Sequence, residues 1–138
     1  MHDALLKLRH GGSSPRVTGT EAGVTSLTRD AGTGQAVVQV DKLPVHGLPI
    51  HVYHDADTGS STDKTLTVTI EASDALGSGW AEVVKFPEVV HGAAKNEMVR
   101  TIASQKKYLR SVITAAGSDG TISVDFVILV GSKAVEED

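Results

Sequence analysis

A strict two-residue alternation in residues 64–73, "KTLTVTIEAS", is the feature that most constrains the fold. Leu66, Val68, Ile70 and Ala72 are apolar, and the residues between them are threonine or glutamate. Successive side chains of a β-strand point to opposite faces, whereas an amphipathic helix repeats its apolar residues every three or four positions. The segment is therefore predicted to be a strand with one buried face and one face in water.

Short apolar segments separated by turn signals make up most of the remaining sequence. Further strands are predicted at 34–40, 49–54, 79–86, 97–103, 107–114 and 121–130, with a fainter one at 23–28. Between them stand segments such as "DAGTG", "DADTGSSTD" and "AGSDG", whose glycine, aspartate and serine residues favour turns. About eight strands at this spacing predict an all-β fold: an antiparallel β-sandwich, with a jelly roll favoured.

The 138 residues suit a single domain. We expect the sandwich to span 16–132, because "GGSSP" separates it from residues 1–15. That first segment is predicted to be an extended arm outside the core, with a two-turn helix as the alternative for "HDALLKLRH". Residues 133–138 are predicted to form an acidic tail.

Leu5, Leu6 and Leu8 form a short apolar patch in this arm, and no segment of the predicted sandwich is an obvious partner for it. An apolar patch without an internal partner is typical of a segment that orders on binding. We therefore predict that these three leucines contact a neighbouring subunit or another protein.

Composition argues against several classes of partner. The net charge is −4, without the basic excess that phosphate-backbone binding requires, so no nucleic-acid partner is expected. Cysteine is absent, which removes disulfides and thiolate metal sites. No apolar run approaches the ~20 residues that span a bilayer, and the N-terminus lacks the apolar stretch of a signal peptide. Synthesis in a cytoplasm, with no membrane partner, is the expectation.

"HVYHDAD" contains the residue types of a metal site: His51, His54, Asp55 and Asp57, with His46 nearby. On one strand His51 and His54 would point to opposite faces, and the H-x-H pattern typical of cupin metalloenzymes is absent. We interpret the four residues as strand-end and turn residues, and a cupin-like metalloenzyme stays a remote alternative. No metal and no cofactor are predicted.

Other catalytic or ligand-binding motifs fail on spacing. A calcium loop starting at Asp55 would need glycine and glutamate where Ser60 and Leu66 stand. "GSG" at 77–79 lacks the spacing of a nucleophile elbow, and "GTG" at 32–34 lacks the longer pattern of a phosphate loop.

The aromatic residues raise the possibility of a glycan-binding module. Trp80, Tyr53 and Tyr108 could stack on sugar rings, but aromatic residues make up only 4% of the chain. Trp80 also alternates with Val84 and Phe86 as a core residue would. Core packing is therefore predicted for Trp80, and glycan binding stays an alternative.

The order of the segments resembles that of a known protein class. "TLTVTIEAS" leads through "SDALGSGW" to a W-x-x-V-x-x-F strand, then to a strand ending in "KKYLR", and then to the closing "TISVDFVILVG". With "RDAGTGQAVVQV" near the start, this pattern is similar to the jelly-roll capsid cement or decoration proteins of tailed bacteriophages. The resemblance covers roughly residues 24–131.

The resemblance implies a non-enzymatic virion protein that binds the outside of the capsid and strengthens the shell against packaged DNA. Its partners would be the major capsid protein and further copies of itself, as a trimer or a dimer. A phage tail component is the nearest alternative.

The closing strand has an unusual outer face. Thr121, Ser123 and Asp125 are polar, whereas Val127 and Leu129, on the same predicted face, are apolar. Burying an aliphatic side chain contributes about 1.5–3 kcal/mol to stability, and an exposed one does not make this contribution. We therefore expect Val127 and Leu129 to be covered, either by a loop of the same chain or at a subunit or capsid contact.

Overall fold

The computed structural model describes residues 7–10, 16–40, 47–103 and 106–131. These residues form strands and turns and contain no helix. The strands are β1 (Lys7–Arg9), β2 (Val38–Gln39), β3 (Leu48–His54), β4 (Thr65–Ser73), β5 (Ala81–Lys85), β6 (Val89–Val90), β7 (Asn96–Ile102), β8 (Tyr108–Ala116) and β9 (Phe126–Val130). In this part of the chain, accordingly, there is no long apolar helix that could cross a membrane.

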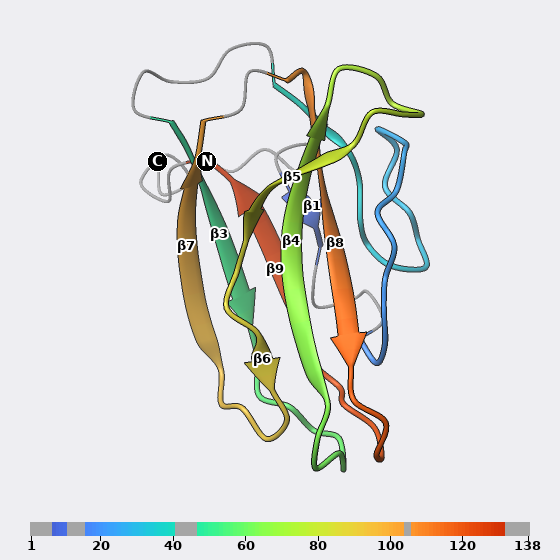
Figure 1. Ribbon diagram of the computed structural model, residues 1–138, viewed down its shortest axis with the longest axis vertical. Coiled ribbons are helices and arrows are strands. Elements are labelled where there is room, and N and C mark those ends of the chain that lie inside the picture. Colours follow the sequence, from blue (N-terminus) through green and yellow to red (C-terminus); the bar gives the residue numbers. More distant parts are fainter. Residues whose placement is uncertain (1–6, 11–15, 41–46, 104–105, 132–138) are drawn as a thin grey trace.

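Two antiparallel sheets pack face to face (Figure 1). The four-stranded sheet has the order β1-β9-β3-β7, and the five-stranded sheet has the order β2-β8-β4-β5, with β6 also pairing with β4. Strands that follow one another in sequence repeatedly lie in different sheets. The predicted all-β antiparallel sandwich is thus confirmed.

The core lies between the two sheets, and the alternation in β4 sets one side of it. Leu66, Val68 and Ile70 are at most 1% exposed and point into the core, while the threonines between them point outward. From the other sheet, Ile50 and Phe126 are fully buried in the same cluster. Burying this apolar surface is the main contribution to folding that the alternation predicts.

The N-terminal residues differ from the sequence prediction. Lys7–Arg9 pair with β9, and Leu8 is fully buried in the core cluster, so the description of 7–9 as an arm outside the core is wrong. Three residues are too few to show a two-residue alternation. Leu5 and Leu6 lie outside the described residues.

Three other boundaries also differ. Residues 23–28 form no strand, and within 34–40 only Val38–Gln39 do so. The closing strand begins at Phe126, although Val124 already forms a β-bridge with Val17, in the segment after β1.

Candidate functional surfaces

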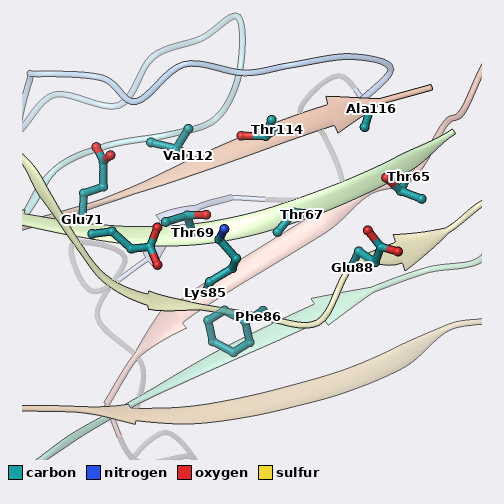
Figure 2. Close-up of a pocket in the computed structure, with 11 residues that line it drawn as sticks. Thr65, Thr67, Thr69, Glu71, Lys85, Phe86, Glu88, Val112, Thr114 and Ala116 are labelled. Atoms are coloured by element: carbon teal, nitrogen blue, oxygen red, sulfur yellow. The ribbon is translucent and has the colours of Figure 1, made fainter. Parts of the chain in front are cut away.

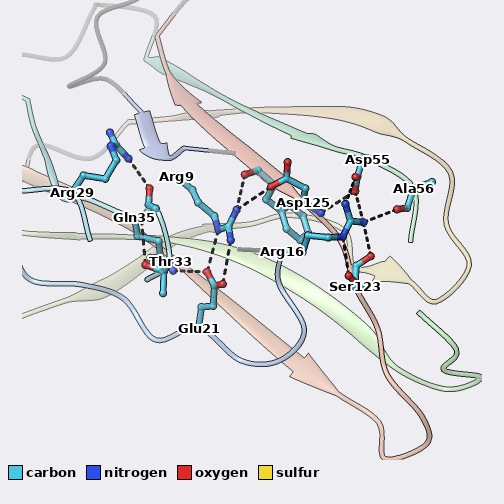
Figure 3. Close-up of polar contacts among 12 residues, drawn as sticks. Arg9, Arg16, Glu21, Arg29, Thr33, Gln35, Asp55, Ala56, Ser123 and Asp125 are labelled. Atoms are coloured by element: carbon cyan, nitrogen blue, oxygen red, sulfur yellow. Dashed lines mark hydrogen bonds and ion pairs between the residues drawn. The ribbon is translucent and has the colours of Figure 1, made fainter. Parts of the chain in front are cut away.

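A buried ion pair joins β1 to the segment that follows it (Figure 3). Arg9 is fully buried, and its Nε and Nη2 lie 3.1 and 3.2 Å from the two carboxylate oxygens of Glu21. Its Nη1 donates to the carbonyl of Phe126 at 2.8 Å, and Gln35 donates to Glu21 at 2.9 Å. A buried charge pair is tolerated when the remaining polar atoms are also hydrogen-bonded, as they are here. This cluster holds the N-terminal strand against the sandwich.

A second arginine, Arg16, joins the chain after β3 to the chain before β9. The guanidinium of Arg16 lies 2.5 and 3.1 Å from the two carboxylate oxygens of Asp55 and also donates to the carbonyl of Ser123 at 2.8 Å (Figure 3). Burial alone would raise the pKa of Asp55. Hydrogen bonds from Arg16 and from the N–H of Asp125, together with the Arg16 charge, outweigh it and hold that pKa below its usual value.

Asp57 binds three backbone N–H groups. Its Oδ1 accepts from Gly59 at 2.8 Å and Ser123 at 2.9 Å, and its Oδ2 accepts from Gly92 at 2.8 Å. Burial would raise the pKa of this carboxyl, but the three hydrogen bonds outweigh it and lower the pKa. The bond to the residue two positions ahead is an Asx-turn, so the prediction of a turn residue is confirmed for Asp57.

Asp63 joins two loops in a similar way. Its carboxylate accepts from the N–H groups of Ser118, at 3.2 Å, and Asp119, at 2.9 Å, and these bonds lower its pKa. Within the described residues, no three histidine or acidic side chains are placed to hold a metal ion together. His46 lies outside those residues.

The two histidines of β3 lie on opposite faces of the sheet. His51 is on the outer face, with Nδ1 3.2 Å from the carboxylate of Glu97. His54 is in the row of residues that faces the core; its Nδ1 lies 2.9 Å from the carbonyl oxygen of Asp55, and its ring packs against Phe126. The two imidazoles therefore do not converge, as their spacing predicted.

Trp80 is half-buried and does not belong to the core cluster, so the prediction of core packing is wrong. Its indole N–H donates to the carbonyl of Leu76, and the guanidinium of Arg110 lies 4.4 Å from the ring centroid. Glu71 holds that guanidinium at 2.7 Å. The cause is a bulge between β4 and β5, which shifts the register by one residue and so reverses the faces.

The arrangement of the aromatic residues does not match a sugar-binding platform. Arg110 covers one face of Trp80, while Tyr53 belongs to the other sheet. Sugar stacking needs exposed aromatic faces close together. The aromatic residues therefore give no support to the glycan-binding alternative.

The outer face of the five-stranded sheet carries an open groove of about 470 Å³ (Figure 2). Outward-facing β4 threonines form its floor, and side chains from β8 and from the β5–β6 segment flank it. Its lining includes Thr65, Thr67, Thr69, Thr114, Lys85 and Glu88. This surface offers hydroxyl, methyl and charged groups for contact.

Leu129 and Val127 lie on the outer face of β9. Leu129 is only 6% exposed in the single chain, opposite Lys7 on one side and His51 on the other. Val127 is half-buried and lies opposite Tyr53. Leu129 is therefore covered within one chain. Of the two β9 residues that the sequence assigned to a contact with another protein, only Val127 remains a candidate.

No protein-family model matches the chain, and no curated protein matches it either.

Proposed function

We propose that the chain is a non-enzymatic virion structural protein that binds the outside of a tailed-phage capsid and stabilises the shell. One observation carries the proposal: three of the segments that resemble cement proteins coincide with strands of the sandwich. "TLTVTIEAS" is β4, the W-x-x-V-x-x-F pattern contains β5, and "FVILV" is β9. "KKYLR" differs in detail, since it leads into β8 rather than ending β7.

The strand order gives further support. The chain passes from β2 in one sheet to β3 in the other, back to β4 and β5, then to β7, β8 and β9 in alternate sheets. Alternation between two sheets of four main strands is the arrangement that a jelly roll uses to form a double-layered sandwich. We propose a jelly roll as the finer description of this fold.

The ionisable side chains near the loops also fit a structural role. Asp55, Asp57 and Asp63 accept hydrogen bonds that fix loops and chain crossings, and Arg9 holds β1 in place. Each of these groups thus has an identified structural task. A protein that works by presenting a rigid surface uses polar residues in this way.

The proposed partners are the major capsid protein and further copies of the chain. Leu5, Leu6 and Val127 are the proposed apolar contacts, whereas Leu8 and Leu129 are removed from that set because they are already buried in one chain. The protein would be made in the host cytoplasm and would end on the capsid surface. A tail component is the nearest alternative in the same class.

Capsid binding can be tested with shells that lack the protein. The purified chain should sediment with such shells and raise the temperature at which they break open. Replacing Leu5 and Leu6 by serine should weaken co-sedimentation, while Leu27→Ser, at a leucine that is 42% exposed, is the matched control and should not. If the wild-type chain fails to bind shells, the proposal is wrong. If the wild type binds and the variant with serine at Leu5 and Leu6 binds equally well, only the contact assignment is wrong.

A further inference from the structure

β7 is the outer edge of the four-stranded sheet, at the left in Figure 1. It pairs with β3 through seven consecutive residue pairs without a bulge. Among the described residues, no strand pairs with its other side. A straight edge of this length is a template on which another strand can pair.

The backbone directions along this edge follow from the hydrogen bonds of β3. The carbonyl of Pro49, the one backbone hydrogen-bonding group of a proline, accepts from the N–H of Gly131, which follows β9, so Pro49 faces β9. These directions alternate along a strand, and Ile50 therefore faces β7 and its partner Arg100. Val99 and Thr101 flank Arg100, so their N–H and C=O groups point away from β3, toward the open edge.

Only some of the backbone hydrogen-bonding groups at the open edge have partners within one chain. The side chain of Arg100 donates to the carbonyl of Val99 at 3.0 Å, in an exposed bond. Neither the N–H of Val99 nor the backbone groups of Thr101 have a partner among the described residues. The Val99 side chain is also 42% exposed, so unpaired edge groups and exposed apolar surface occur at one place.

We propose that two copies of this chain pair β7 with β7, antiparallel, across a two-fold axis at Val99. In this register Val99 lies opposite its own copy, Glu97 opposite Thr101, and Met98 opposite Arg100, so no like charges face each other. Registers centred on Glu97 or on Arg100 would set like charges opposite each other, which destabilises strand pairs. The charge pattern of β7 therefore fits a second copy of itself.

Such pairing joins the four-stranded sheets of two copies into one continuous sheet, and the β7 edge of each copy is then paired. A two-fold contact closes with two copies, so it specifies a dimer rather than a trimer. The inference deepens the assembly part of the proposed function, but its geometry does not depend on the capsid. The two can therefore fail separately.

Sedimentation equilibrium of the full chain tests the assembly. The wild type should reach twice the 14.4 kDa chain mass. Val99→Lys places two like charges opposite each other and should raise the dimer dissociation constant at least about tenfold. Val90→Lys is the matched control, at an edge-strand valine of β6 that is 44% exposed, and should leave the constant unchanged. Circular dichroism of each variant checks that it is folded.

A single introduced cysteine tests the register without disturbing charge. The chain has no cysteine of its own, so any disulfide must join two introduced residues. Directly opposite residues that exchange hydrogen bonds have Cα atoms about 5.5 Å apart, within the range that a disulfide spans. Oxidised Val99→Cys should therefore run as a covalent dimer, and Val90→Cys should stay monomeric.

Several outcomes would overturn the proposal. These are a monomeric or trimeric wild type, a folded Val99→Lys that dimerises as well as the wild type, or equal cross-linking of the two cysteine variants. A monomeric wild type whose binding to shells is lost only in Val99→Lys would assign the edge to the capsid protein instead. Dimerisation without shell binding would support this pairing and contradict the proposed function.

Discussion

The guanidinium of Arg9, fully buried, lies 3.1 Å from the carboxylate of Glu21, and this pair joins strand β1 to the segment that follows it. Removing one partner of a buried pair leaves the other charge uncompensated. We expect Arg9→Ala to lower the free energy of unfolding by about 3–5 kcal/mol. Urea unfolding followed by circular dichroism measures this change.

The control for that experiment is an exposed ion pair. Lys106 lies 3.3 Å from Asp74, and both side chains are at least half exposed. Exposed pairs contribute about 0–1 kcal/mol, so Lys106→Ala should have a small effect. If Arg9→Ala and Lys106→Ala lower the free energy of unfolding equally, the Arg9 cluster does not stabilise the fold as described.

Asp57 should make stability depend on acid pH. Its pKa in the fold lies below its value of about 3.9 in an unfolded chain, so folding favours the carboxylate. The stability it contributes is complete above about pH 4 and is lost as the pH falls through the folded pKa. Asp57→Asn should cost about 1–2 kcal/mol at pH 7, because an amide cannot accept all three backbone bonds as well.

The gap between the wild type and Asp57→Asn should narrow below about pH 4, where the wild-type carboxylate becomes protonated. Urea unfolding at a series of pH values gives both curves. A gap that stays constant down to about pH 2 would contradict the role assigned to this carboxylate.

Gly59 is required by a close backbone approach. A Cβ atom there would lie 2.2 Å from the carbonyl oxygen of Thr121, whereas one at Gly77 would meet nothing within 4 Å. We expect Gly59→Ala to cost about 1–3 kcal/mol through overpacking, with Gly77→Ala as a near-neutral control. Thermal unfolding of the two variants checks it, and similar melting temperatures for both would count against the described loop packing.

Trp80 reports on the outer face of the five-stranded sheet, since it is the chain's single tryptophan. Arg110 covers one face of its ring. Arg110→Ala should expose the indole, so its emission should shift to longer wavelength and acrylamide should quench it more strongly. Unchanged quenching would mean that the two side chains are not stacked in solution.

The sequence predicted the strands that have one buried face. In β4 the alternation of Val68 and Ile70 with threonines is visible because the inner face is apolar and the outer face is polar. β1 is too short for such a pattern, and Leu8 was therefore assigned to an external contact although it is buried in the core. The error at Trp80 has another cause, because the bulge in β5 changes the face without leaving a sign in the sequence.

The polar contacts were harder to predict than the strands. Arg9 and Glu21 are 12 positions apart, and Arg16 and Asp55 are 39 apart, so only the folded chain brings each pair together. The turn role of Asp57 could be predicted, because an Asx-turn involves neighbouring residues. The open edge of β7 could not, because which strands lie at the edges depends on the sheet order rather than on local sequence.

Cryo-electron microscopy of the native phage particle tests the central proposal most directly. We expect ordered density for this sandwich on the outside of the capsid shell, in contact with the major capsid protein. Particles whose capsid surface carries no such density, or in which the sandwich lies in the tail, would contradict it.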